Sequence, residues 1–496
     1  MKKLLMGVLM LVSLILLSSC SESNSVYEFV IDDSYDNYIV LGTSADYPPY
    51  EWPMKNDGKS TVVGIDIELA KEIAKATKNN LRVINKGFDF LLEDLREGKV
   101  DFVLSGMNPT DSRKEIVDFS NIYYYASHAI MIHKDNLNTY NSIIDLNNAK
   151  TKIGAQLGSI QQELVDTSFP LSVKQYLQAI PDLIMQLDDK SIDALVIEEP
   201  VAKVYSKKYQ DLVILDALIG NENDGSAAAV KKGNNELLTI INQVIAELKT
   251  SGQLDKIILD AVNLNESSSN SGSFSFLLES HFIVLLLKGL LMTIILAVLS
   301  VGLGSVLGFF IALMKLSDKK YLSIPAKWYI DIIRGTPLLV QVLLIYSFIQ
   351  LPVSIVFGID LSNFIPGMIA LLINSSAYVS EIIRGGILAV DKGQKEAALS
   401  LGMTNNQVMK KIILPQAIKN IIPSLGNEFV TMIKETSIFM YLGVAELMYS
   451  AQIVKTETYQ VKEVYIVVAI LYLVLTLSTS KIMSVLEKRL RVHEQK

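Results

Sequence analysis

The stretch D-K-G-Q-K-E-A-A-L-S-L-G-M-T-N-N-Q-V-M-K-K-I-I-L-P, Asp391 to Pro415, decides the fold of the C-terminal half of this 496-residue chain. It is polar and charged, although its apolar residues recur at roughly helical spacing. Gly402 interrupts the pattern and Pro415 ends it, which predicts a short helix, a tight turn and a second short helix. Because the ends of such helices expose polar backbone groups, the segment cannot lie in hydrocarbon and must lie at a membrane face.

Long apolar segments on both sides of this stretch predict a membrane domain that crosses the bilayer five times. If the chain starts outside, five spans place the stretch 391–415, the lysine-rich loop 315–327 and the basic C-terminal tail in the cytoplasm. The excess of Lys and Arg in these loops agrees with the positive-inside rule. The predicted spans are His281–Leu313, Trp328–Leu351, Asn363–Leu388, Asn420–Leu442 and Val461–Met483.

The chain has two halves of opposite charge. Residues 1–273 carry a net charge of −13 and residues 274–496 carry +6, which together give the −7 of the whole chain. The acidic half argues against nucleic acid as a partner, because nucleic-acid binding needs a basic surface. Cys20 is the only cysteine, so no disulfide can form within the chain.

The N-terminus predicts export. Lys2 and Lys3 precede the apolar run Leu4–Leu17, which is short for a membrane span and typical of a secretory signal. Leu17-Ser18-Ser19-Cys20 also resembles a bacterial lipobox, which implies cleavage before Cys20 and lipidation of its thiol. An uncleaved anchor or a chance cysteine is the alternative. We therefore expect a signal peptide over 1–20 and a loose polar tether over 21–37.

Residues 38–262 alternate strand-like and helix-like segments, which predicts an α/β domain with parallel strands. A Ser/Asn-rich stretch without periodicity, Asn263–Ser273, predicts a flexible linker over 263–276 that keeps this domain close to the membrane domain at 277–490. The expected strands are Tyr38–Thr43, Leu81–Ile84, Asp101–Ser105, Lys152–Ala155 and Ala194–Ile197, and the expected helices are Gly64–Thr77, Phe90–Glu97, Ser159–Val165, Asn235–Thr250 and Leu254–Ala261.

Several blocks of this region, in this order, resemble the periplasmic-type solute-binding proteins for polar amino acids. The resemblance implies a type II fold of two α/β lobes joined by two crossover strands, with the ligand in the cleft. We expect lobe 1 over about 38–127 and 230–262, lobe 2 over about 128–229, and hinges near Ser127–Ile132 and Ser226–Val230. The matching blocks are G-T-S-A-D-Y-P-P-Y-E (42–51), G-I-D-I-E-L (64–69), S-G-M-N-P-T-D-S-R (105–113), V-D-F-S (117–120), Q-L-G-S-I-Q-Q-E (156–163) and D-A-L-V-I-E-E-P (193–200).

The resemblance implies which residues bind the backbone of an amino acid ligand. By the family pattern Arg113 binds the carboxylate, since its planar fork matches two oxygens. Gly106, Asn108 and Ser159 would help through backbone N–H groups or a hydroxyl, although many relatives have Ser or Thr at the position of Asn108. Two further positions in the matching blocks, Ser105 and Gln156, belong to the expected site.

The second lobe is expected to supply the partner of the ligand ammonium. By position that residue is Glu198, where relatives usually carry Asp, and the adjacent Glu199 is the competing candidate. With Arg113 on one lobe and the acid on the other, only the closed cleft satisfies both charges, so ligand binding selects closure. Tyr47 and Phe88 match the family's aromatic walls, although an aromatic residue in such a domain is often only part of the core.

Selectivity for the ligand side chain depends on Ser44 and Asp46. Ser44 occupies a position where glutamine- and histidine-binding relatives carry Asp. Asp46 lies two residues on and faces the same side as Ser44 if the strand continues. A buried Asp46 anion would favour Lys or Arg as the ligand, whereas a solvated Asp46 would leave glutamine or another neutral polar ligand, and the sequence leaves both open.

The spacing of Glu396-Ala397-Ala398, Gly402 and I-x-L-P at 412–415 resembles the EAA loop of ABC importer permeases. The resemblance implies that this stretch is a coupling helix held in a cleft of a separate cytoplasmic ATPase. Gly58-Lys59-Ser60 looks like the end of a phosphate loop, but Pro53 stands where its first glycine is needed, so we expect no cofactor in this chain and ATP in the partner. Further matching blocks are L-L-K-G-L-L-M-T (286–293), I-I-R-G-T-P-L-L-V-Q (332–341) and I-K-E-T-S-I (433–438).

Ionisable residues within the apolar spans suggest a path for the solute, because such residues are costly in the membrane and usually face partners or water. Glu428, Lys434 and Glu435 are the candidates to border this path. The alternative is a structural role at helix ends or in an ion pair such as Glu381–Arg384. The four histidines show no metal-ligand spacing beyond a lone H-x₄-H, His128 and His133, so we expect no metal.

These features together predict a binding protein fused to its permease. We expect a subunit of an ATP-driven importer of glutamine, arginine, lysine or a similar amino acid, in a bacterial cell membrane with the binding domain outside, and not itself an enzyme. One five-span module cannot enclose a two-fold path, which predicts a homodimer that binds two ATPase subunits. We expect the membrane domain of each chain to contact lipid. The rival is an amino-acid-gated receptor or sensor with the same cleft, for which the sequence shows neither a channel filter nor a cytoplasmic signalling pattern.

Overall fold

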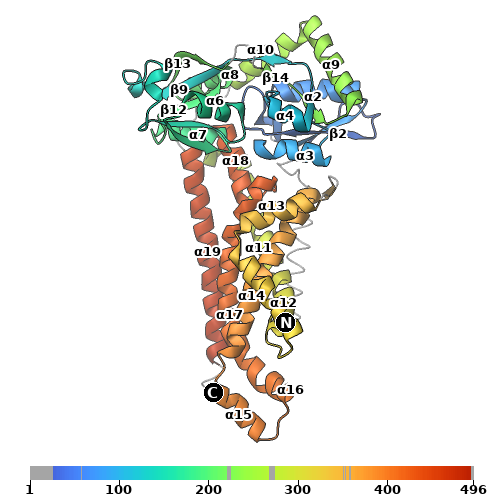
Figure 1. The fold of residues 1–496 in the computed structure, drawn as a ribbon, viewed down its shortest axis with the longest axis vertical. Helices are drawn as coiled ribbons and strands as arrows, with labels where there is room; N and C mark the ends of the chain where they lie inside the picture. The colour runs from blue at the N-terminus through green and yellow to red at the C-terminus, as the bar shows by residue number, and fades with distance from the viewer. Residues whose placement is uncertain are drawn as a thin grey trace.

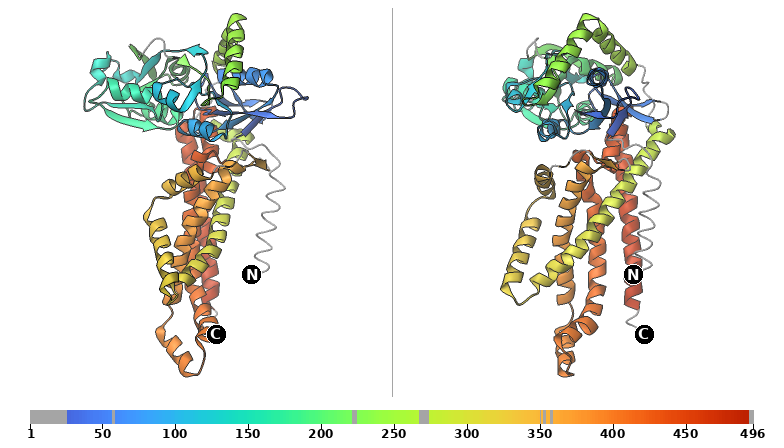
Figure 2. Two further views of the ribbon diagram at one scale, coloured as in Figure 1. Left: turned by 45° about the vertical axis from the view of Figure 1, so that its right-hand side comes forward. Right: turned by 90° about the vertical axis from the view of Figure 1, so that its right-hand side faces the viewer.

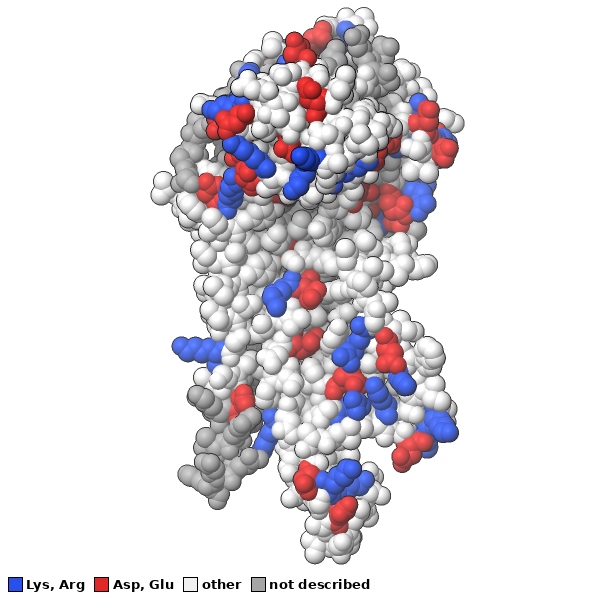
Figure 3. Space-filling view, turned by 60° about the vertical axis from the view of Figure 1, so that its left-hand side comes forward, with Lys and Arg blue, Asp and Glu red and all other residues white. Residues whose placement is uncertain are grey.

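The computed structural model describes residues 26–56, 59–220, 225–266, 274–349, 351, 354–356 and 359–492. An α/β domain of two lobes lies at one end of a long bundle of helices (Figure 1). The lobes lie side by side across that end, and a short helical segment protrudes from the opposite end (Figure 2). On the face shown in Figure 3, charged side chains gather on the α/β domain and toward the far end of the bundle, with mostly uncharged atoms between them.

Lobe 1 contains a six-stranded sheet in the order β1-β5-β2-β6-β15-β7. Strands β2, β5 and β6 are parallel, and their apolar residues are almost all buried, as expected where helices cover a parallel sheet. The strands are β1 (Val26–Phe29), β2 (Tyr38–Thr43), β5 (Asn80–Asn85), β6 (Phe102–Val103), β7 (Val117–Phe119) and β15 (Ala229–Lys231), and the helices are α2 (Ile65–Ala76), α3 (Leu91–Glu97), α4 (Asp111–Ile116), α9 (Asn235–Thr250) and α10 (Gln253–Glu266).

Lobe 2 contains a five-stranded sheet in the order β11-β10-β12-β9-β13. The chain enters it after β8 (Tyr124–Tyr125) and leaves it through β14 (Gly225–Ser226), and these two crossover strands pair with each other. The two-lobed type II fold expected from the sequence is therefore confirmed. The remaining elements of lobe 2 are β9 (His128–His133), β10 (Lys152–Gln156), β11 (Val173–Leu177), β12 (Ala194–Glu198), β13 (Leu212–Ile219), α5 (Ile143–Leu146), α6 (Ile160–Ser168), α7 (Ile180–Asp188) and α8 (Glu199–Lys208).

Two segments expected to be irregular contain regular structure. The predicted tether 21–37 includes β1, which pairs antiparallel with β5 and buries Val26 and Tyr27, so the prediction of a loose tether is wrong for these residues. The predicted linker begins within α10, which continues to Glu266. The proposed signal peptide and Cys20 lie outside the described residues.

The C-terminal domain is mostly helical. Among the described residues, α11 (Ser280–Lys315), α14 (Leu361–Leu388) and α19 are long and apolar enough to cross a membrane, and there are five such spans if two bent pairs each count as one. Helices α12 (Lys320–Gly335) and α13 (Leu338–Phe348) meet at 108°, and residues 405–442 meet α18 (Leu447–Thr458) at 53°. Helix α19 covers Val461–Val492.

The second predicted span, Trp328–Leu351, is wrong as a single straight helix. The chain breaks at Gly335-Thr336-Pro337, between α12 and α13. The proline has no backbone N–H to continue the helix and its ring excludes the carbonyl one turn earlier, which accounts for the bend.

Small residues bring α11 and α14 into close contact. A Cβ atom built on Gly304 would lie 2.8 Å from the side chain of Ser375, and one built on Gly308 would lie 2.7 Å from the carbonyl oxygen of Ser376. Helices in a membrane gain little from apolar burial alone, so close packing at small residues holds them together.

The stretch 391–415 forms the protruding end of the bundle (Figure 1). Helix α15 (Lys392–Ser400) is followed by a turn in which Gly402 has a φ of +83°, and then by α16 (Asn405–Val408). The prediction that Pro415 ends the second helix is wrong. A π-helical turn, Met409–Ile413, leads without a break into α17 (Leu414–Glu435), and Pro415 is tolerated there because it lies in the first turn of that helix.

Candidate functional site

Arg113 reaches from α4 of lobe 1 to the edge of lobe 2. The side chain of Thr110 caps α4 by accepting from the Arg113 backbone N–H, and this orients the first turn. The guanidinium donates to the carbonyl oxygen of Asn108 at 2.7 Å and to that of Gly158, in lobe 2, at 2.8 Å. It also lies over the Phe88 ring, 5.4 Å from its centroid. Burial lowers the pKa of Arg113 to about 10, so the group stays a cation at neutral pH.

Glu198 lies opposite, at the end of β12 in lobe 2, and is 1% exposed. Its backbone N–H donates to the hydroxyl of Tyr47 in lobe 1 at 3.4 Å, and the Tyr47 ring stacks on Tyr50. Burial first, and then the charge of Glu198, raise the pKa of both tyrosines, which keeps them neutral. Glu199 points elsewhere, to Lys203 and Ser127, so Glu198 is the acid within the cleft.

Ser44 and Asp46 lie together, although not because the strand continues. Strand β2 ends at Thr43, and a turn then brings the Ser44 hydroxyl to 3.3 Å from Asp46 Oδ1. Asp46 Oδ2 accepts from the backbone N–H of Ile180, the first residue of α7 in lobe 2, also at 3.3 Å. Asp46 is 4% exposed, and burial raises its pKa to about 7 while the charge of Lys455 lowers it in part.

Two groups expected to bind the ligand are instead bound within the chain. The Gly106 N–H donates to Asp66 at 2.8 Å, and the Ser159 hydroxyl donates to the Gln156 carbonyl and caps α6. Both residues are buried or closely packed, and these particular groups already have partners within the chain, because a buried polar group needs a partner in the folded state. The amide nitrogen of Asn108, in contrast, is buried without a hydrogen-bond partner among the described residues.

A pair of buried acids, Glu51 and Asp66, lies behind Ser105, and no motif in the sequence indicated a role for them. The Ser105 hydroxyl donates to Glu51 at 2.6 Å, and Asp66 accepts from the hydroxyl of Tyr123 at 2.6 Å. Burial raises the pKa of both acids, and for Glu51 the neighbouring Asp66 raises it further. Both acids lie in quoted sequence blocks, but only the fold brings them together.

The cleft is closed, and hydrogen bonds between the described residues of the two lobes cross it. Besides those of Arg113, Asp46 and Tyr47, the Gln178 side chain of lobe 2 donates to Asp89 of lobe 1 at 2.9 Å. The other predicted site residue of lobe 2, Gln156, is buried and donates to the carbonyl oxygen of Gln178. The cleft mouth faces the membrane domain, in a small cavity lined by residues of both, among them Ser44, Asp46, Gln178, Tyr441, Tyr449 and Gln452.

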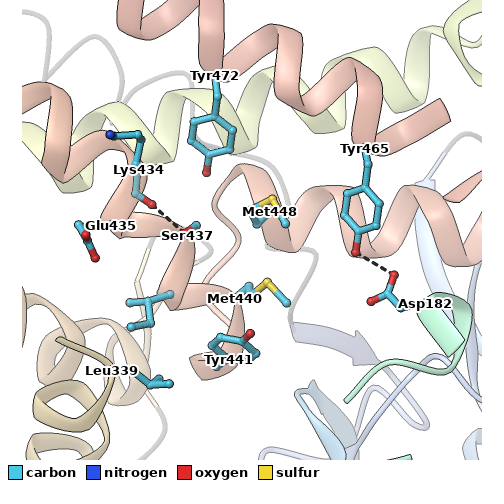
Figure 4. Close-up of a pocket in the computed structure, with 11 residues that line it drawn as sticks. Asp182, Leu339, Lys434, Glu435, Ser437, Met440, Tyr441, Met448, Tyr465 and Tyr472 are labelled. Carbon is cyan, nitrogen blue, oxygen red and sulfur yellow. Dashed lines mark hydrogen bonds between the residues drawn. The ribbon is translucent and has the colours of Figure 1, made fainter. Parts of the chain in front are cut away.

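A larger cavity of about 600 Å³ lies between lobe 2 and the membrane domain (Figure 4). Lys434 and Glu435, two of the three predicted path residues, line it together with Asp182 of lobe 2. Glu428 does not line it, but lies buried about two turns lower on α17. Glu381 is bound to Arg384 at 2.8 Å and Lys315 at 2.7 Å, which is the structural role that the sequence offered as an alternative.

The predicted coupling residues lie at the far end of the bundle. Glu396, Ala397 and Gly402 are exposed, whereas Ala398 is 5% exposed and packs against the chain's own helices. No atom lies within 4 Å of a Cβ built on Gly402. This end of the molecule therefore presents a backbone turn and small side chains to its surroundings.

Two families match the two halves of the chain. Residues 39–260 match the bacterial extracellular solute-binding proteins, family 3, and residues 304–492 match the binding-protein-dependent transport system inner membrane component. The arginine-binding extracellular protein ArtP of Bacillus subtilis is 38% identical over 248 residues, which are 49% of this chain and 90% of ArtP. The putative glutamine transport system permease protein GlnP of Rickettsia felis is 41% identical over 221 residues, which are 44% of this chain and all of GlnP. The chain belongs to the amino acid ABC transporters.

In this transporter the binding protein and the permease are one chain. The arginine transport system permease protein ArtQ of Bacillus subtilis is another relative of the permease half, 39% identical over 42% of this chain and 94% of ArtQ. A solved substrate-binding protein, AbpA from Streptococcus pneumoniae bound to L-arginine, is 37% identical with a TM-score of 0.45, and the match covers 46% of this transporter and 96% of AbpA. These relatives are transport proteins and not enzymes.

Proposed function

We propose that this chain is the substrate-binding and permease subunit of an ATP-driven importer of a cationic amino acid, such as arginine or lysine. The supporting observation is the pair of opposite charges, Arg113 in lobe 1 and Glu198 in lobe 2, buried across the closed cleft. A bidentate cation suits the α-carboxylate of an amino acid and a buried anion suits its ammonium group. Only the closed form offers both, so the amino acid stabilises closure.

Asp46 supports a cationic side chain on the ligand. With Arg113 and Glu198 assigned to the α-groups, Asp46 is a further acid at the cleft mouth, and no described Lys or Arg of the binding domain forms an ion pair with it. A buried carboxylate is costly unless a cation neutralises it. A guanidinium or ammonium on the ligand would supply that cation, whereas the amide of glutamine would not. The relatives are named for both arginine and glutamine, so their names do not decide this point.

Coupling to ATP is proposed for the exposed end of the bundle. Helix α15 and the Gly402 turn project from the helices on the side opposite the binding domain. If the binding domain is outside the cell, this end is in the cytoplasm, where a separate ATPase subunit would hold α15. We further propose that two copies of the membrane domain enclose the path and that the solute passes Lys434 and Glu435, since charged groups in membrane helices usually face a polar path.

The test is a calorimetric titration of the full-length chain in lipid nanodiscs with each of the twenty amino acids. We expect L-arginine or L-lysine to bind most tightly, and Asp46→Asn to weaken their binding while it leaves L-glutamine nearly unchanged. Tighter binding of L-glutamine to the unaltered chain would contradict the cationic ligand. Uptake into vesicles without any ATPase subunit would contradict the proposed energy source.

A further inference from the structure

Helix α18 of the membrane domain contacts both lobes of the binding domain. On the side of lobe 1, the Tyr449 hydroxyl donates to the Asn85 carbonyl at 3.0 Å, and Glu457 accepts from Ser60 at 2.9 Å. On the side of lobe 2, Lys455 Nζ lies 2.6 Å from Asp182 Oδ1, and the Lys455 side chain is 1% exposed. Figure 1 shows α18 directly beneath the two lobes.

The contact with lobe 2 is a compact group of three side chains. Tyr465 of α19 donates to the same Asp182 oxygen at 2.8 Å, and Lys455 donates to the Tyr465 hydroxyl at 2.7 Å. Figure 4 shows Tyr465 pointing at Asp182 from the neighbouring helix. A buried lysine needs an anion close by, and Asp182 provides it from the other domain.

Asp182 lies on the turn of lobe 2 that also bonds to lobe 1 across the closed cleft. Ile180, two residues earlier on α7, donates its backbone N–H to Asp46 of lobe 1, and this bond exists only while the lobes are together. The first turn of α7 thus binds lobe 1 on one side and the membrane domain on the other. If the lobes separate, this turn moves relative to Asn85 of lobe 1, the residue that Tyr449 binds.

The contact of lobe 1 with the membrane domain does not depend on closure. Tyr346 of α13 donates to Asp94 at 2.6 Å, and its ring lies between Lys86 and Lys99, with centroid distances of 4.4 and 3.4 Å. All three partners belong to lobe 1. Lobe 1 can therefore stay anchored through Tyr346 while lobe 2 opens and closes.

We propose that α18 acts as a closure gauge: Tyr449 and Lys455 bind lobe 1 and lobe 2 at the separation of the closed cleft, so that lobe 2 docks through Asp182 only when ligand has closed the domain. The two residues are six positions apart on one helix, or about 9 Å along its axis. A rigid helix cannot follow lobe 2 as it swings away, so the open domain keeps the lobe 1 contact alone. The inference rests on the proposed function for its ligand and adds a discriminating contact to it.

The experiment measures the position of lobe 2 in the full-length chain. The single cysteine, Cys20, is replaced by serine, and spin labels are attached at Lys150→Cys on exposed lobe 2 and at Leu278→Cys, which is 88% exposed beside α11. Distances are measured by pulsed electron resonance in nanodiscs, with and without L-arginine. We expect a broad distribution without ligand and a narrow one with it.

Substitutions then test whether the narrow distance distribution depends on the ion pair between Lys455 and Asp182. Lys455→Met and Asp182→Asn should each leave it broad at saturating L-arginine, and the exchanged pair Asp182→Lys with Lys455→Asp should narrow it again. Lys462→Met is the matched control, because Lys462 pairs with Asp188 at 3.4 Å on the same lobe but is half exposed. This control should leave the distribution narrow.

The outcomes separate this inference from the proposed function. If L-arginine does not bind the unaltered chain by calorimetry, the proposed ligand is wrong, and the distances are measured with whichever amino acid binds. If a ligand binds but Lys455→Met gives the same narrow distribution as the unaltered chain, α18 is not a gauge. A ligand-free distribution as narrow as the loaded one overturns it as well, and so does failure of the exchanged pair to narrow the distribution.

Discussion

The ligand cleft and the segment 391–415 are the two surfaces proposed to meet partners, and they differ in burial. Arg113 and Glu198 are at least nine-tenths buried and are held by other residues of the chain, whereas Glu396, Ala397 and Gly402 are exposed. A cleft that closes on its ligand needs its own structure to position each group. A surface that awaits a second protein needs only the right shape and small side chains. Substitutions should therefore affect binding at the first surface and transport at the second.

The largest effect is expected from Arg113→Ala. Removing one member of a buried, hydrogen-bonded charge pair costs about 2–5 kcal/mol, so affinity for the amino acid should fall at least about 30-fold and up to about 4,000-fold. Calorimetry on the full-length chain measures this loss. Arg96→Ala is the matched control in the same lobe, because Arg96 is 61% exposed and its ion pair among the described residues is with Glu93 on its own helix. Equal losses from both substitutions would place the ligand elsewhere.

The adjacent acids Glu198 and Glu199 allow a sharper test within the cleft. Glu198→Gln keeps the shape and removes the charge, so we expect an affinity loss of about 30-fold, equivalent to about 2 kcal/mol. Glu199→Gln should change affinity less than about twofold, since an exposed ion pair such as Glu199–Lys203 contributes under about 1 kcal/mol. A larger effect at Glu199 would reverse the assignment of the ammonium site.

Motifs in the sequence predicted candidate residues for the cleft but not all of their bonds. The type II fold brings the block around Arg113 and the end of the strand before Glu198 to the two sides of the closed cleft, and their contact with a ligand stays a prediction. The bonds of Gly106 to Asp66 and of Ser159 to Gln156 could not be predicted, since each depends on where an unrelated element packs. The bond of Ser105 to Glu51 could not be predicted for the same reason.

Longer-range features were still less accessible from sequence. The helix break before α13 had a local signal, Gly335-Thr336-Pro337, but a prediction from hydropathy alone made one continuous span across it. Pro415 looked like a helix end although it can equally begin one. The contact of Lys86 with Tyr346 joins residues 260 positions apart in two domains, and no spacing rule connects them.

The coupling surface is tested with Ala397→Trp. Ala397 is exposed, so the substitution should not disturb the fold or ligand affinity, but the added ring would obstruct a closely fitting partner. We expect uptake into vesicles that contain the ATPase to fall about tenfold, which corresponds to about 1.4 kcal/mol of lost coupling. Leu278→Trp, at the opposite end of the bundle and 88% exposed, should transport normally. Unchanged uptake by the Ala397 variant would remove α15 from the coupling surface.

The smallest effect concerns how the free energy of unfolding of the ligand-free chain depends on pH, and it arises at Asp46. Burial raises the pKa of Asp46 from 3.8 to about 7, so the folded state holds a proton that the unfolded chain has lost. The resulting stability is complete below pH 3.8 and is lost as pH rises through about 7, and between pH 6 and pH 7 the loss is about 1 kcal/mol. Glu51 and Asp66 shift in the same direction, so the comparison with Asp46→Asn isolates one residue. The unfolding free energy is measured by urea unfolding, followed by the fluorescence of the buried Trp52 with Trp328 replaced by Phe. If the stability of Asp46→Asn depends on pH as strongly as that of the unaltered chain, Asp46 is not the source.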